Sequence, residues 1–297
     1  MLLKKMLPLT LVIPCFIACR PKPIDIEVPQ AAPSITISSL AFDEHTVFVS
    51  AGYSINSTAS LNDTAAENRT ESGVPRDMLI DNAIVTITES NGTPDTLHRV
   101  TNGVYASRKL NLKYGVEYTL MVRDLNKDLA TTATTVFLSQ PSVTSAERII
   151  EYSATDTLTK LHLNIKNVAA GDKFFVTYST KQQVKSNVDQ AKDRAQILYN
   201  FSPKTLEFVT SADATDGLID KTITMKVNPE DTLIVQVAHI DNSYFEYLSA
   251  YKRTGYLINQ LTGEPINLPT NVTPGYGFFS LCESERVVFV GNKRIRL

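Results

Sequence analysis

Apolar and polar residues alternate along most of the chain after residue 33, which is the pattern of strands that bury one face. A polar stretch from Asn56 to Arg76 interrupts the pattern and predicts a long loop. Asn91-Gly92 and Asn102-Gly103 separate neighbouring segments and suit tight hairpin turns with positive φ. In this part of the chain the alternation predicts strands at Ser34–Leu40, Thr46–Ile55, Ala83–Glu89, Leu97–Val100, Val104–Ala106, Glu117–Arg123 and Thr131–Leu138. We therefore predict a small antiparallel β-sandwich domain over residues 34–140.

Strand-like alternation resumes beyond Gln140-Pro141-Ser142, which we take as the domain boundary. The segment from Gln183 to Tyr199 is polar and irregular, with room for one or two helical turns. The strands predicted here are Ile149–Tyr152, Lys160–Lys166, Lys173–Thr180, Thr205–Thr210, Lys221–Val227, Thr232–Ile240, Phe278–Leu281 and Arg286–Val290. Residues 141–297 are therefore predicted to form a second, β-rich domain.

One helix interrupts the second group of strands. Ser243 and Glu246 have the spacing of a capping box, in which each side chain accepts a hydrogen bond from the other residue's backbone. Tyr244, Tyr247 and Tyr251 follow at helical spacing and place an apolar stripe on one face. The sequence therefore predicts a mainly all-β fold of two sandwich-like domains, the second carrying one packed helix near residues 243–254.

The first eighteen residues have the pattern of an export signal. Lys4 and Lys5 precede an apolar run from Met6 to Ala18. As a helix this run would extend about 20 Å, which is short of the roughly 30 Å hydrocarbon core of a membrane. Ala18-Cys19 resembles the end of a bacterial lipobox, so we predict a lipoprotein signal peptide at 1–18, lipidation of Cys19 and attachment to a membrane through the lipid anchor. The alternative is an ordinary secretory signal with a chance cysteine.

A proline-rich stretch follows the predicted lipidation site. Prolines at positions 21, 23, 29 and 33 keep residues 19–33 extended, so this stretch is expected to be a tether. Removal of the signal reduces 29 basic residues to 27 against 31 acidic ones, a net charge of −4. No basic block suggests a nucleic-acid partner. Cys282 would be the one unmodified cysteine, so we expect no intramolecular disulfide and a buried structural thiol rather than a reactive one.

Enzyme and metal motifs are not found in the sequence. It has no Gly-x-Ser-x-Gly elbow, no His-Glu-x-x-His and no phosphate-binding loop, and its four histidines share no ligand spacing. Asp124-x-Asn126-x-Asp128 copies the start of a calcium loop, but Leu129 and Thr135 occupy the positions of the required glycine and glutamate. We therefore expect a solvated hairpin turn there, no catalytic residue, no metal and no cofactor.

Two further patterns leave alternatives open. Asp-Thr followed by Leu or Ala occurs four times, and either marks the start of a strand or resembles the O-glycan acceptor of exported Bacteroidota proteins. The candidate acceptors are Thr64, Thr96, Thr157 and Thr232. Aromatic residues are dense after residue 243 and form either the core beneath the helix or an apolar or sugar-stacking binding surface.

Several short motifs, taken in order, resemble one family. They are Cys19 followed by Ile24-Asp25-Ile26-Glu27-Val28-Pro29; Ile80-Asp81-Asn82-Ala83-x-Val85-x-Ile87; Gly103-x-Tyr105; Tyr114-Gly115-x-x-Tyr118-x-Leu120; the helix around Tyr244–Tyr251; and Asn271-Val272-x-x-Gly275-Tyr276-Gly277-Phe278-Phe279. Together they resemble the Bacteroidota lipoprotein family catalogued as domain of unknown function 4249. The middle motifs are also similar to transthyretin-like, carboxypeptidase-regulatory-like and Ig-like β-sandwich modules.

The resemblance implies an outer-membrane lipoprotein with an accessory role beside a TonB-dependent receptor, and it carries over no catalytic residue. We therefore expect a lipid-anchored, non-catalytic binding or accessory subunit of a nutrient uptake system, with a ligand that the sequence does not identify. The alternative is a fimbrillin-like pilus or adhesin subunit, which would need an exposed groove or a detachable terminal strand. Arg20-Pro21-Lys22-Pro23 lacks the acidic residues associated with surface export, so both faces of the outer membrane stay open.

Overall fold

The computed structural model describes residues 32–41, 43–54, 75–90, 92–152, 157–181, 205–254 and 267–295. The predictions for the signal peptide, Cys19, the tether, Thr64 and the helical turns within 183–199 lie outside these residues. All of the strands that the structure describes belong to one compact unit. The domain boundaries at 34–140 and 141–297 stay predictions.

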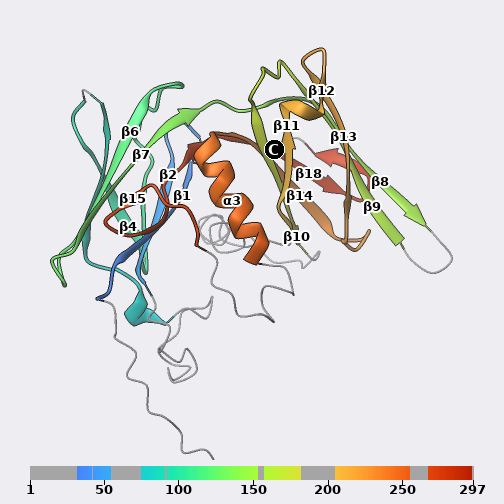
Figure 1. Ribbon diagram of the computed structural model, residues 1–297. Coiled ribbons are helices and arrows are strands. Elements are labelled where there is room, and N and C mark those ends of the chain that lie inside the picture. The colour runs from blue at the N-terminus through green and yellow to red at the C-terminus, as the bar shows by residue number, and fades with distance from the viewer. Residues whose placement is uncertain are drawn as a thin grey trace, which may run out of the picture. The chain divides into compact units, whose positions relative to one another are not determined.

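The first seven strands form one continuous antiparallel arrangement in the order β7-β6-β3-β4-β5-β2-β1. Figure 1 labels β1, β2, β4, β6 and β7 of this arrangement. They are β1 (Ile35–Ala41), β2 (Val47–Tyr53), β3 (Ala83–Glu89), β4 (Asp95–Thr101), β5 (Val104–Ser107), β6 (Glu117–Asp124) and β7 (Ala130–Leu138), with a short 3-10 helix η3 (Arg76–Met78) before β3. β4 pairs with β3 through residues 95–97 and with β5 through residues 98–101, so it passes from one layer to the other. The seven predicted strands of this part are confirmed.

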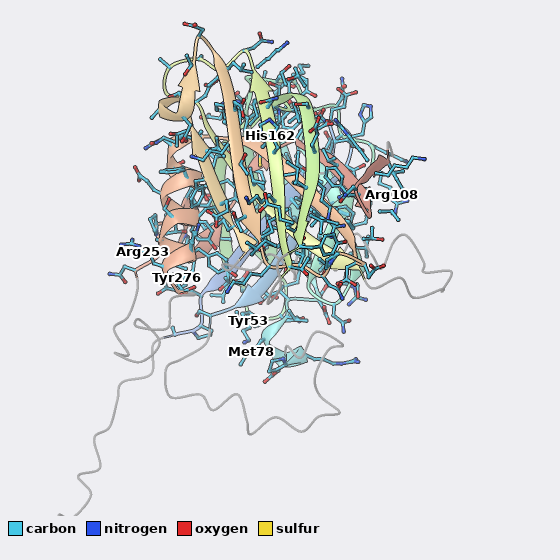
Figure 2. The ribbon with its side chains drawn as sticks, turned by 90° about the vertical axis from the view of Figure 1, so that its right-hand side faces the viewer. Tyr53, Met78, Arg108, His162, Arg253 and Tyr276 are labelled. Atoms are coloured by element: carbon cyan, nitrogen blue, oxygen red, sulfur yellow. The ribbon has the colours of Figure 1, made fainter. Side chains whose placement is uncertain are left out.

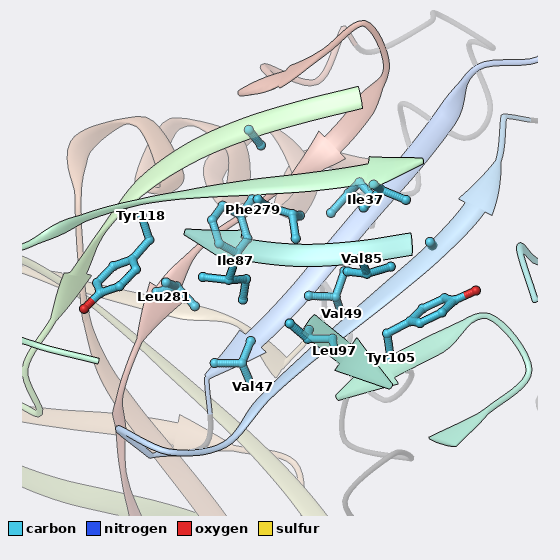
Figure 3. Close-up of a cluster of buried hydrophobic side chains, with 14 of the residues drawn as sticks. Ile37, Val47, Val49, Val85, Ile87, Leu97, Tyr105, Tyr118, Phe279 and Leu281 are labelled. Atoms are coloured by element: carbon cyan, nitrogen blue, oxygen red, sulfur yellow. The ribbon is translucent and has the colours of Figure 1, made fainter. Parts of the chain in front are cut away.

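Alternate residues of these strands point inward and form a buried core, part of which Figure 3 shows. Val85, Ile87 and Leu97 contribute from β3 and β4, while Ile37 and Val49 face them from β1 and β2. This is the one-face burial that period-two alternation predicts. Each such aliphatic side chain contributes about 1.5–3 kcal/mol by leaving water.

Three short strands from near the C-terminus close this arrangement. β15 (Val272–Thr273) pairs antiparallel with β7, β16 (Tyr276–Phe278) pairs parallel with β1, and β17 (Leu281–Cys282) pairs parallel with β7. The pairs among β1–β7 are all antiparallel, as predicted for residues 34–140, and the parallel pairs come from the C-terminal segment. The expectation of one continuous strand at Phe278–Leu281 is wrong, because β16 ends at Phe278 and β17 begins at Leu281. The physical reason for this break is that side chains take the place of strand pairing at the two residues between them. The Asn271 amide bonds to both backbone groups of Phe279, and the Ser39 hydroxyl bonds to both backbone groups of Ser280.

The remaining strands form two further sheets, in the orders β12-β13-β9-β8 and β11-β10-β14-β18-β19. Their inward residues, including Leu161, Leu163, Val235, Val237 and Phe289, are fully buried in a second core. The strands are β8 (Ser142–Tyr152), β9 (Thr157–Lys166), β10 (Lys173–Lys181), β11 (Glu207–Thr210), β12 (Ala214–Thr215), β13 (Leu218–Met225), β14 (Thr232–Ile240), β18 (Ser284–Val290) and β19 (Lys293–Ile295), with a 3-10 turn η5 (Ser211–Asp213) before β12. Sheets packed face to face over a common core confirm the predicted mainly all-β, sandwich-like fold.

The predicted helix is α3 (Asn242–Thr254). It begins one residue earlier than expected, and the predicted capping box at Ser243 and Glu246 is wrong. Asp241 is the capping residue, because its carboxylate accepts the Tyr244 amide at 2.8 Å. Leu248 packs with Ala238 and Ile240 of β14 and with Phe175 of β10. Within the described ranges, no helix is both long enough and apolar enough to cross a bilayer.

Candidate functional site

The predicted glycan acceptors that the structure describes lie on separate strands. Thr96 is exposed on β4, whereas Thr157 and Thr232 are half-buried first residues of β9 and β14. The two strand starts fit the interpretation that Asp-Thr-Leu begins a strand. No pair of these threonines shares a sheet, so they form no common site. Their glycosylation and the lipidation of Cys19 stay predictions.

The histidines are dispersed over the structure. His162 on β9 lies 3.5 Å from Asp220, and His239 on β14 lies 3.4 Å from Asp172. Figure 2 shows His162 on the face of β9 that is turned toward the viewer. No cluster of three or more potential metal-ligating side chains occurs among the residues that the structure describes.

Asp124 belongs to the turn between β6 and β7, where the sequence predicts a hairpin. It is fully buried and accepts hydrogen bonds from the Tyr53 hydroxyl at 2.5 Å and from the amides of Asn126 and Lys127. The Lys127 ammonium lies 3.5 Å from the centre of the Tyr53 ring. Burial, with the nearby Asp124 carboxylate, raises the pKa of Tyr53 well above its usual value. The Asp124-x-Asn126-x-Asp128 segment is therefore a turn in which protein hydrogen-bond donors already occupy the Asp124 carboxylate.

The C-terminal aromatic residues divide into core members and a half-buried cluster at α3. Phe279 and Phe289 are fully buried in the first and second cores. Tyr244, Tyr247 and Tyr251 instead form a ladder along α3, with ring centroids 6.0 and 6.3 Å apart and interplanar angles of 11° and 5°. Burial raises the pKa of all three hydroxyls.

The tyrosine ladder joins the helix to strand β16. The Phe278 ring lies 5.0 Å from that of Tyr244 and 5.2 Å from that of Tyr247. Tyr276, two residues earlier on β16, is 56% exposed, and Figure 2 places its side chain near the margin of the strands. Phe278, which is 4% exposed, is buried beneath these tyrosines, and we call Tyr244, Tyr247, Tyr251 and Tyr276 the aromatic surface. Because most of its ring faces already contact one another, it presents ring edges, hydroxyl groups and the open ring of Tyr276.

Comparison with known proteins identifies the family. The family model described as "Domain of unknown function (DUF4249)" matches residues 21–286. The chain belongs to the DUF4249 family. Among curated proteins no relative matches. Among solved structures, a two fibronectin type-III domain segment from chicken tenascin is similar, with 13% identity, 71% of this chain and 93% of that chain covered, and a TM-score of 0.21.

Cys282 of this DUF4249 chain is a buried free thiol, as the sequence predicts. Burial raises its pKa to about 12, and its sulfur lies 3.8 Å from the Ser280 hydroxyl. At neutral pH the thiol is therefore protonated and a poor nucleophile. It packs in the same cluster as Leu248 and Ile240, beneath the aromatic surface. Its part in this DUF4249 fold is structural.

Sequence reasoning missed the residues that hold the C-terminal segment of the DUF4249 chain against the first strands. The Glu283 carboxylate accepts hydrogen bonds from the Tyr114 hydroxyl and from the Gln140 amide, the second at 2.6 Å. The Tyr114 ring stacks on Phe137 at 4.8 Å. The one signal was Tyr114-Gly115 among the family motifs, which gives no hint of a partner 169 residues away.

Proposed function

We propose that this DUF4249 chain is a lipid-anchored protein of the Bacteroidota cell envelope, held at the outer membrane through Cys19. In this proposal it serves as a non-catalytic binding or accessory subunit of a TonB-dependent nutrient uptake system. The observation that carries the proposal is the aromatic surface, where an exposed tyrosine borders a helix whose own tyrosines are packed in place.

The geometry of this surface favours recognition of a protein partner. Tyrosine combines a large apolar ring with a hydroxyl and has few rotatable bonds, so it orders at low entropic cost. Tyr247 stacks with both Tyr244 and Tyr251, so each ring of the ladder already has a stacking partner. Stacking of sugar rings needs open faces, and on this surface Tyr276 offers the most exposed one. A protein partner can use ring edges and hydroxyl groups as well.

The fimbrillin-like alternative receives less support. A donor-strand mechanism is expected to need an exposed groove or a terminal strand that can detach. Strand β18 pairs with β14 over residues 284–289 and with β19 over residues 288–290. Both sides of β18 are therefore engaged, so of the last two described strands only the three-residue β19 lies at a sheet edge where it could detach.

An affinity purification tests the proposal. A tagged full-length chain is solubilised from native membranes as wild type, as Tyr276→Ala and as Val100→Ala, a control that alters another residue more than half exposed. We expect a TonB-dependent receptor to co-purify with the wild type and the control, and its yield to fall for Tyr276→Ala. Recovery of pilus subunits, or of the chain alone, would contradict the proposed role.

The anchor is tested separately. Cys19→Ala should move the protein from the membrane fraction to the soluble fraction, because alanine cannot carry the acyl groups that would hold the chain to lipid. Cys15→Ala, which changes the other cysteine of this region inside the predicted signal peptide 1–18, is the matched control and should leave the protein in the membrane fraction. Retention of Cys19→Ala in the membrane fraction would show that the lipidation prediction is wrong.

A further inference from the structure

Strand β8 is a long strand that pairs on one side only. Ten of its eleven residues pair with β9, all but Thr144, and no second partner strand occurs in the part of the chain that the structure describes. The other strands at sheet ends are much shorter: β11 has 4 residues, β12 has 2 and β19 has 3. At about 3.3 Å per residue, β8 presents roughly 36 Å of backbone edge. Unpaired backbone groups of this kind pair most readily with another extended strand.

Part of this edge is held rigidly in place. The register shifts between Val143 and Ser145, so the regular edge runs from Ala146 to Tyr152. Within it the Arg148 side chain points inward and is 3% exposed. Its guanidinium donates to the carbonyls of Asp231 at 3.0 Å, Gly291 at 3.1 Å and Asn228 at 3.0 Å. β8 is thereby fixed to the β13–β14 connection and to the β18–β19 turn, which lowers the ordering cost of adding a strand.

The solvent side of the edge carries acidic and apolar groups. Glu147, Ile149 and Glu151 alternate with inward residues, and all three are exposed. Ile149 is 41% exposed, and Tyr152 at the end of the strand is 76% exposed. Glu151 bonds to Lys160 at 2.7 Å. A partner strand facing this side therefore meets two carboxylates four residues apart with an apolar side chain between them.

A second copy of the chain does not complement this edge. In a two-fold antiparallel pair centred on Ile149, Glu147 of each copy would face Glu151 of the other, and like charges in opposition are destabilising. No other register supplies a cation, because the outward residues between Ser145 and Glu151 include none. The edge discourages self-association and selects for the opposite charge.

We propose that the edge of β8 from Ala146 to Tyr152 binds an extended segment of a partner protein in which two basic residues flank an apolar one at alternate positions. The partner adds a strand beside β8, with its basic side chains opposite Glu147 and Glu151 and its apolar side chain on Ile149. This inference rests on the proposed function only for the source of the segment, a subunit of the uptake system. The binding itself follows from the edge.

Hydrogen exchange of the detergent-solubilised full chain tests this with two synthetic peptides, TRTVTRT and TETVTET. We expect the basic peptide to slow amide exchange over residues 146–152 and the acidic peptide to leave it unchanged. Glu147→Arg should weaken binding of the basic peptide about fivefold and allow the acidic peptide to bind, since one attractive cross-strand pair becomes repulsive. Glu117→Arg, at an exposed position of β6, is the matched control and should change neither result.

Three outcomes would overturn the proposal. They are unchanged exchange over residues 146–152 with the basic peptide at saturation, equal slowing by both peptides, and slowing that depends on protein concentration without peptide. The last would identify a second copy as the occupant. The receptor co-purification does not enter this experiment, so failure of the proposed function and failure of the β8 edge are distinguished.

Discussion

Gly277 is the residue at which the C-terminal segment comes closest to strand β1. It lies opposite Ile37 in the parallel β1–β16 pair and has a φ of +92°. A Cβ atom at this position would lie 1.9 Å from the Ile37 carbonyl oxygen and 2.9 Å from its carbonyl carbon. The obstacle is backbone, which cannot rotate aside as a long side chain can. Gly277→Ala therefore requires β16 to move away from β1.

The size of the effect follows from these distances. Ordinary contact for a Cβ begins at 3.4 Å, so the strands must separate by 3.4 − 1.9 = 1.5 Å. That is enough to break the hydrogen bonds of a three-residue pairing, each worth about 1 kcal/mol net. The positive φ adds about 1–2 kcal/mol for a residue with a Cβ. We expect the free energy of unfolding to fall by roughly 4 kcal/mol in total, which is large for a single substitution.

Gly291→Ala provides the matched control. Gly291 also has a positive φ, +57°, but a Cβ there would meet no atom within 4 Å. Only the backbone cost of about 1–2 kcal/mol applies. Guanidinium denaturation of both variants measures the difference, and hydrogen exchange of residues 36–38 and 276–278 locates it. Equal midpoints for the two variants, with unchanged exchange at β1, would refute the steric argument.

Three further predictions concern buried and hydrogen-bonded groups. Arg148→Met should lower the free energy of unfolding by about 3 kcal/mol, because three carbonyls lose a charged donor, and Arg148→Lys should lose less; denaturant midpoints measure both. The hydrogen bond to Glu283 and burial raise the pKa of Tyr114 to about 12. The protonated Tyr114 hydroxyl therefore adds its full stabilisation below pH 10, and this stabilisation is lost as pH rises through 12. Tyr114→Phe should make the free energy of unfolding less dependent on pH between these values, and thermal melts at alkaline pH measure this. Cys282 should react with a thiol reagent at the rate of global unfolding; a fast reaction in the native state would contradict its burial.

The sequence predicts both ends of a strand correctly in the segments where alternation is regular. Ala83–Glu89 and Thr232–Ile240 are β3 and β14 with unchanged bounds. β8 was recognised only from Ile149 onward although it begins at Ser142. Arg148 occupies an inward position where alternation leads one to expect an apolar side chain. Its burial depends on carbonyls of two distant turns, and no local pattern records such partners.

The pairing of residues 271–282 with β1 and β7 could not be predicted from the sequence for a related reason. Its strands have two or three residues each, too few for any periodicity. Side-chain amide and hydroxyl groups of Asn271 and Ser39 make bonds that a regular ladder would make through the backbone. Gly275-Tyr276-Gly277 was noted as a family motif, but the close approach that requires Gly277 appears only once β1 is placed beside it.

The density of aromatic residues near the C-terminus was readable, whereas their division between core and surface was not. Phe278 and Phe279 are neighbours in sequence and both are buried, yet Phe278 packs against the tyrosines of α3 while Phe279 lies in the core of the first strands. The most exposed member of the aromatic surface, Tyr276, therefore lies on the segment that closes that core. Gly277→Ala should impair stability and partner binding together, while Tyr276→Ala should impair binding alone. If Tyr276→Ala also lowered stability as Gly277→Ala does, Tyr276 would be a structural residue and the aromatic surface would lose its main support as a binding site.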